Sequence, residues 1–196
     1  MVEKKKNDDI KINISIKRVT ILATTLFIIF AIYFYYPQIY NWYKYSQPVK
    51  KIVYFNVPME FREDLRLAKN IGVYPNEEII REIFWNQELN RITIAVLNTT
   101  NETHYIGVEA YEITFKLTSF YTLNGLSVEI KGKEVSDILE LKGNYTNPVI
   151  YIIPPVIANE ALVRIENYTV FISGKSLKEL DLATIRFIIT VLGIRV

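Results

Sequence analysis

An uncharged apolar run near the N-terminus constrains this chain more than any other feature. Val19–Tyr36 reads VTILATTLFIIFAIYFYY and contains 18 residues without a charge. As a helix, a run of that length is about 27 Å long, close to the ~30 Å hydrocarbon core of a bilayer. A soluble helix seldom carries apolar side chains on every face. The run therefore predicts a single membrane-spanning helix.

The distribution of basic residues around this run predicts its orientation. More of them precede the run (Lys4, Lys5, Lys6, Lys11, Lys17 and Arg18) than follow it closely (Lys44, Lys50 and Lys51). Because basic residues stay on the cytoplasmic side, residues 1–18 are expected to be a cytoplasmic tail and residues 48–196 an extracytoplasmic domain. Residues 37–47 would be an aromatic juxtamembrane linker. The sequence thus predicts a single-pass protein of the cell membrane, with the lipid bilayer as one partner.

The end of the run distinguishes an anchor from a cleaved leader. It ends in bulky aromatic residues instead of the small residues that precede a signal-peptidase site, which favours an uncleaved signal anchor. A pilin-like leader cut near Lys17-Arg18, leaving the apolar helix to pack in a surface filament, remains an alternative.

Composition excludes several classes of function. The chain has no cysteine, so disulfides, thiolate catalysis and cysteine-ligated zinc are excluded. A net charge of +2 gives no basic field for nucleic acid. The scarcity of cysteine and methionine beside many lysines and glutamates is typical of a heat-adapted, archaeal-like source, although numerous asparagines argue against it.

Asn-X-Ser/Thr sequons are frequent in residues 37–196. Four asparagines occupy such sites, each at the end of a predicted element, where a sugar would meet water: Asn98, Asn101, Asn144 and Asn167. The ordinary alternative is that asparagine and threonine are simply turn residues. With the predicted outward topology, the pattern favours an N-glycosylated domain.

The outer region shows alternating strand and helix patterns. Good helix signals are the Asn76 N-cap before Glu77 and Glu78, and the Ser176/Glu179 capping box of the last helix, which Gly193 ends. Other expected elements are strands at 52–57, 92–97, 127–130 and 149–153, helices at 59–70 and 106–123, and a hairpin of 161–165 with 169–173. This order predicts a layered α/β domain with a mostly parallel sheet. An Ig-like β-sandwich is the alternative if 106–123 is a strand.

Candidate chemistry is sparse. His104 has no evident nucleophile or carboxylate partner, and no phosphate-binding or hydrolase motif occurs. The Glu60, Glu63 and Asp64 cluster is interpreted as the wet face of a short helix, and Glu109 and Glu112 with Lys116 as a solvated helix strip. Asp181 is placed on the solvent face of the last helix. No catalytic, cofactor-binding or metal-binding residue is predicted.

Two functions remain open. The first is a non-catalytic accessory or interaction subunit of a membrane or cell-surface assembly, with a protein partner, since aromatic residues are frequent and the last helix is apolar nearly all round. The second is a membrane-tethered enzyme or ligand-binding module. Its site would form at the carboxyl ends of the strands, where four residues would converge: Asn98, His104, Asn159 and Glu160.

Overall fold

The computed structural model describes residues 24–25, 35, 50–97 and 103–195. The chain divides into two compact units, Met1–Gln47 and Pro48–Val196. All helices and strands discussed below belong to the second unit, which is an α/β domain with a mixed sheet.

A six-stranded sheet forms the centre of this domain, in the order β3-β7-β8-β6-β4-β5. Its members are β3 (Gly72–Tyr74), β4 (Arg91–Leu97), β5 (Glu129–Val135), β6 (Val149–Ile153), β7 (Leu162–Glu166) and β8 (Thr169–Ser173). Strands β5, β4, β6 and β8 run parallel, whereas β7 is antiparallel to β8 and β3 pairs parallel with β7. The α/β prediction is thus confirmed, with a sheet of mixed direction.

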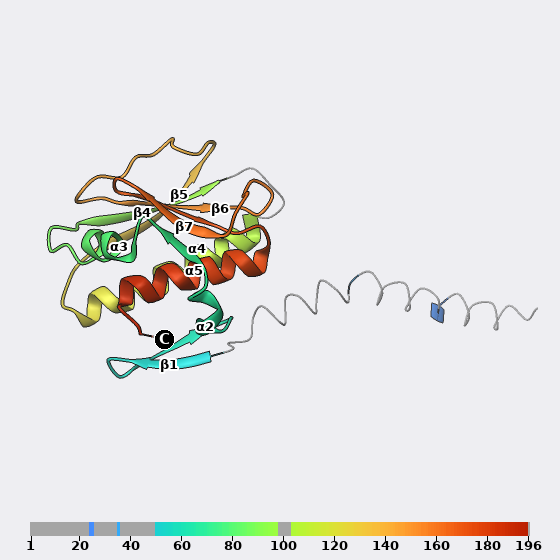
Figure 1. Ribbon diagram of the computed structural model, residues 1–196, viewed down its shortest axis with the longest axis horizontal. Coiled ribbons are helices and arrows are strands. Elements are labelled where there is room, and N and C mark those ends of the chain that lie inside the picture. The colour runs from blue at the N-terminus through green and yellow to red at the C-terminus, as the bar shows by residue number, and fades with distance from the viewer. Residues whose placement is uncertain (1–23, 26–34, 36–49, 98–102, 196) are drawn as a thin grey trace, which may run out of the picture. The chain divides into compact units, whose positions relative to one another are not determined.

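The helices all lie on one face of this sheet (Figure 1). They are α2 (Leu65–Ala68), α3 (Glu77–Phe84), α4 (Thr103–Leu123) and α5 (Leu177–Leu192). Alternating residues of the strands, such as Ile150 and Ile152 of β6, point into the core beneath the helices. Tyr151 and Phe171 point to the opposite face, where loops 136–148 and 154–161 cover them with Ile138, Leu141 and Ala158.

A hairpin of β1 (Lys50–Tyr54) and β2 (Val57–Phe61) lies on the far side of the helix layer from the sheet (Figure 1). Phe55 and Asn56 form its two-residue turn, and both have positive φ. The predicted strand at 52–57 and helix at 59–70 are therefore only partly right. The chain reverses within the first, and only the four residues of α2, capped by the Asp64 carboxylate, are helical in the second.

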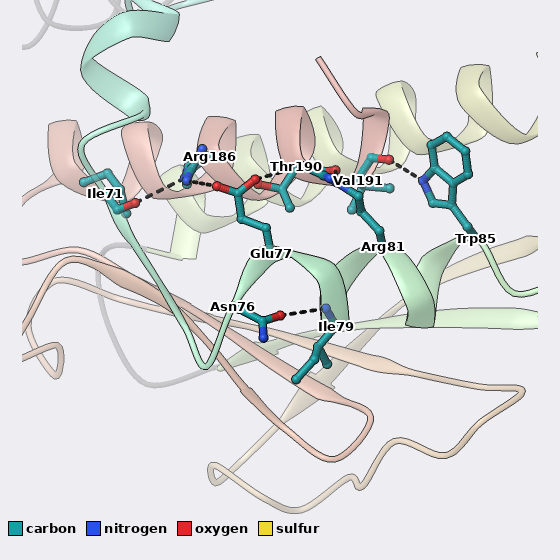
Figure 2. Close-up of polar contacts among 9 residues, drawn as sticks. All are labelled: Ile71, Asn76, Glu77, Ile79, Arg81, Trp85, Arg186, Thr190 and Val191. Atoms are coloured by element: carbon teal, nitrogen blue, oxygen red, sulfur yellow. Dashed lines mark hydrogen bonds and ion pairs between the residues drawn. The ribbon is translucent and has the colours of Figure 1, made fainter. Parts of the chain in front are cut away.

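Helix α3 packs on α5 through a polar seam (Figure 2). The Asn76 side chain caps α3 by accepting a hydrogen bond from Ile79 N, as predicted. Arg186 of α5 contacts the Ile71 carbonyl and Glu77, and the Trp85 indole donates to the Val191 carbonyl at 2.6 Å. Because α5 also contacts α2 and α4, it is the central helix of the layer.

The prediction of a membrane-spanning helix is wrong for the part of the chain that the structure describes. No described helix combines the length and the apolar character needed to cross a membrane. The longest, α4, carries Glu109, Glu112 and Lys116. Of the run 19–36, only Thr24, Thr25 and Tyr35 are described, and the predicted tail and linker also lie outside the described residues. The single-pass and signal-anchor interpretations are therefore not supported.

The Ig-like alternative is also wrong. Residues 103–123 form one continuous helix that connects the parallel neighbours β4 and β5, which is a βαβ unit. The predicted C-terminal hairpin is confirmed as β7 and β8, and the last helix begins after its Ser176 cap and ends at Gly193, whose φ is 66°.

Candidate functional site

Helix α4 has its charged side chains inside and two of its aromatic side chains outside, although Phe120 and Tyr121 are buried. Its charged residues after His104 are Glu109, Glu112 and Lys116; Glu109 is 5% exposed and Lys116 2% exposed. Tyr111 and Phe115, by contrast, are 65% and 51% exposed. A helix at a protein surface normally shows the opposite pattern. The outer side of α4 is therefore a candidate interaction surface.

An apolar groove runs along this outer side, with a volume of about 460 Å³. It is lined by Val57 of β2 and by seven α4 residues, none of them charged: Tyr111, Thr114, Phe115, Thr118, Ser119, Thr122 and Leu123. We call these eight residues the α4 groove. The Tyr111 and Phe115 rings stack with their centroids 6.1 Å apart and their planes 18° from parallel. Together they form one continuous aromatic surface.

Two hydroxyls of the α4 groove are already satisfied within the helix. Thr114 Oγ1 donates to the Ala110 carbonyl at 2.8 Å, and Ser119 Oγ donates to the Phe115 carbonyl at 2.9 Å. Because these donors are used, burying this face would not leave them without an acceptor. The groove is thus less polar than its sequence indicates.

The β1–β2 hairpin forms the wall of the groove and is fixed against the helix layer. The Tyr54 hydroxyl donates to the Leu192 carbonyl at 2.9 Å, and its ring lies 6.4 Å from that of Phe120 in α4. This anchor places Val57 beside α4 and leaves Phe55 exposed at the turn. A bulky residue with positive φ at an exposed turn is unfavourable by itself, and such strain is concentrated at functional sites.

The inner side of α4 holds a buried charge cluster of Arg62, Glu109, Glu112, Lys116 and Asp181. Arg62 Nη2 lies 3.3 Å from Glu109 Oε1 and 3.7 Å from Asp181 Oδ1, and Arg62 Nε lies 3.7 Å from Glu112 Oε1. Lys116 pairs with Glu112, and its Nζ lies 4.7 Å from the centroid of the Phe61 ring. The cluster connects α4 and α5 with Arg62, the residue that follows β2.

Burial changes the proton affinity of this cluster. It raises the pKa of Glu109 to about 7, with a contribution from the charge of Asp181, while Arg62 opposes the rise. Burial also raises the pKa of Asp181 to about 6, and it lowers that of Lys116 to about 8. Three carboxyls face two cations, and Glu109 Oε2 and Asp181 Oδ2 have no hydrogen-bond partner. One bound proton would make the cluster neutral.

The prediction that Glu109, Lys116 and Asp181 lie in solvent is wrong. Asp181 is 2% exposed and points into the helix layer, and Glu109 is buried beside it. The signal was present in the sequence, because Glu109 and Lys116 occupy the same side of the helix as Ile106, Ile113 and Leu117. The Glu60–Asp64 cluster disperses instead: Glu60 pairs with Lys51, and Asp64 caps α2.

The described residues offer no metal centre. Among residues 50–97 and 103–195, no group of three or more His, Asp or Glu side chains is arranged to hold a metal ion. In the α4 cluster the carboxylates face Arg62 and Lys116, which occupy the positions that a cation would need.

A second cavity of about 290 Å³ lies at the carboxyl ends of β6 and β8. Asn159 and Glu160 line it, as the enzyme hypothesis expects. Asn98 lies outside the described residues, and of His104 only the backbone, in α4, is described. The Ser173 hydroxyl in this cavity donates to the Leu162 carbonyl, and Arg164 pairs with Glu166. Among the described residues of the cavity, therefore, no nucleophilic side chain is hydrogen-bonded to a general base.

Two of the predicted glycosylation sites lie in exposed turns. Asn144 accepts hydrogen bonds from Thr146 N and Asn147 N, and Asn167 has a φ of 54° in the β7–β8 turn. Asn98 and Asn101 lie outside the described residues. Glycosylation at these four positions stays a prediction.

The comparisons with known proteins add no relative from which a role could be transferred. No protein-family model, no curated protein and no solved structure matches this chain. The features that bear on function are therefore those of the chain itself: the α4 groove, the charge cluster beneath it and the cavity at the strand ends.

Proposed function

We propose that this protein is an interaction subunit that binds a protein partner through the α4 groove. One observation carries the proposal: α4 buries its charges while it exposes two of its aromatic rings, Tyr111 and Phe115, beside an uncharged groove. Burying charges is unfavourable and exposing Tyr111 and Phe115 gains nothing, so the arrangement is advantageous only when the outer side is covered.

The groove indicates the chemistry of the partner. Its lining contains no charge, so a charged group placed there would lose its water without gaining a counterion. From Tyr111 to Leu123, the lining extends for about 18 Å, at 1.5 Å per residue. That length suits an uncharged helix face of about three turns, with Tyr111 and Phe115 as the aromatic anchors of the interface.

A photo-reactive amino acid at Thr118 tests this proposal in cells that produce the protein. Thr118 lies in the groove between Phe115 and Thr122, so we expect light to give a discrete protein adduct. Adding Phe115→Glu should reduce its yield by about tenfold or more, because a charge would be buried in the interface. The measurement is the mass and yield of the adduct on a denaturing gel.

The matched control is Val156→Glu, which places the same charge at an exposed apolar position in the loop over the opposite face of the sheet. We expect this variant to keep the adduct. A yield that is equal in Phe115→Glu and Val156→Glu, or the absence of any adduct, would contradict a docking role for α4.

A further inference from the structure

We infer that the occupant of the α4 groove is the α4 helix of a second copy of this chain, packed antiparallel across a two-fold axis. This inference rests on the proposed docking function and names its partner. The order of large and small side chains along the groove supports this arrangement.

The groove is divided by side-chain size along the helix. Its N-terminal half carries the two aromatic rings, Tyr111 and Phe115, on either side of Thr114. Its C-terminal half carries the small residues Thr118, Ser119 and Thr122, and Leu123 follows at the end of the groove. A second α4 in the parallel direction would place rings against rings and leave the small half unfilled. In the antiparallel direction, the large half of each copy packs on the small half of the other, as close packing requires.

The positions of these residues also define a register. With the two-fold axis midway between Phe115 and Thr118, Phe115 faces Thr118 of the second copy and Tyr111 faces its Thr122. Thr114 then faces Ser119 of the second copy. Every groove residue from 111 to 122 therefore meets another groove residue, and each contact occurs twice, as in an isologous interface.

Charge favours self-association as well. A surface that packs on its own copy must not bring like charges together. The outer side of α4 carries none, since Glu109, Glu112 and Lys116 all lie on its inner side with Arg62. The Thr114 and Ser119 hydroxyls, which would meet across the axis, already bond to their own helix. Two identical faces can thus meet without an unpaired charge and with these two donors satisfied.

The first test is the mass of the purified full-length chain by sedimentation equilibrium over a range of concentrations. We expect twice the chain mass of 22.9 kDa at micromolar concentration. Phe115→Glu should weaken dimerisation by about 100-fold or more, because the substitution enters a two-fold interface twice. Val156→Glu should leave the mass unchanged. Thermal melting of both variants checks that each is folded.

The second test uses the absence of cysteine from the chain, which lets single cysteines report the register. Along the helix axis, residue 118 is offset from its own copy by about 4.5 Å and residue 122 by about 16.5 Å, at 1.5 Å per residue. With a short bifunctional thiol reagent, Thr118→Cys is expected to cross-link to itself. Thr122→Cys should not cross-link to itself, and it should cross-link to Tyr111→Cys when the two variants are mixed.

A monomer at all concentrations, a dimer that persists in Phe115→Glu, or equal cross-linking of Thr118→Cys and Thr122→Cys would overturn the inference. The photo-adduct at Thr118 separates this failure from failure of the docking role. An adduct that contains a different chain overturns self-association and leaves docking intact. The absence of any adduct removes both.

Discussion

Replacing Arg62 by methionine is expected to lower the free energy of unfolding by about 3–5 kcal/mol at pH 8. The Arg62 side chain is 11% exposed and is the cation shared by Glu109, Glu112 and Asp181. Methionine fills a similar volume, so most of the loss reflects three largely buried carboxyls that keep only Lys116 as a cation. Urea unfolding followed by circular dichroism measures it.

The loss should become much smaller at pH 5. The folded-state pKa values of Glu109 and Asp181 are raised, to about 7 and about 6. The stability that Glu109 and Asp181 contribute is therefore fully present below their pKa values in the unfolded chain. It is lost as the pH rises through their pKa values in the folded chain. Without Arg62, whose charge lowers both pKa values, the two carboxyls hold their protons to higher pH. At pH 5 both are neutral and no longer need the cation.

Lys116 does not reverse this trend. Burial lowers its pKa to about 8 in the folded chain. The stability that Lys116 contributes is therefore present above its pKa in the unfolded chain and is lost as the pH falls through its folded pKa. Between pH 5 and pH 7 it stays charged, and the pH dependence of the cluster comes from Glu109 and Asp181.

Arg164→Met is the matched control for this prediction. Arg164 pairs with Glu166 at 3.4 Å, but both side chains are about half exposed. Water screens such a pair, so its removal should change the free energy of unfolding by less than about 1 kcal/mol at either pH. If Arg62→Met lost the same free energy of unfolding at pH 5 and pH 8, the protonation of Glu109 and Asp181 would not be linked to unfolding, and this prediction would be wrong.

The sequence predicts those elements whose local signals agree with their burial. Asn76 and Ser176 cap their helices as expected, and Gly193 ends α5 in the left-handed conformation. The β1–β2 hairpin was missed because its turn, Phe55-Asn56, has no glycine and takes positive φ at a phenylalanine. A turn of that type is stabilised by tertiary contacts, here the Tyr54 anchor on α5, which no local pattern records.

The candidate site was missed for a related reason. Sequence patterns assign charged residues to the solvent-exposed face of a helix, whereas α4 carries them on its buried face. Glu109 is tolerated inside because Arg62, far away in sequence, pairs with it. Lys116 is tolerated because Glu112 pairs with it and the charge of Asp181, on another helix, favours its charged form. The sequence shows only that aromatic residues are frequent, and the structure decides that Tyr111 is exposed on the outer side of α4.

Gly143→Ala is expected to lower the free energy of unfolding by about 3 kcal/mol or more, because it forces backbone segments apart. A Cβ at this position would lie 1.9 Å from the Tyr168 carbonyl oxygen and 2.9 Å from Val149 N. Those two atoms are themselves hydrogen-bonded to each other at 3.0 Å, where β6 begins beside β8. The new methyl group cannot be accommodated by a change of rotamer, so either this hydrogen bond breaks or loop 136–148 lifts from the sheet.

Gly132→Ala in the edge strand β5 provides the comparison, since a Cβ there meets nothing within 4 Å. It should leave stability unchanged or raise it by up to about 1 kcal/mol through the smaller entropy of the unfolded chain. Urea unfolding of both variants measures the difference. If Gly143→Ala were as stable as Gly132→Ala, loop 136–148 would not be packed on the sheet as described, and the cover over Tyr151 and Phe171 would have to be placed elsewhere.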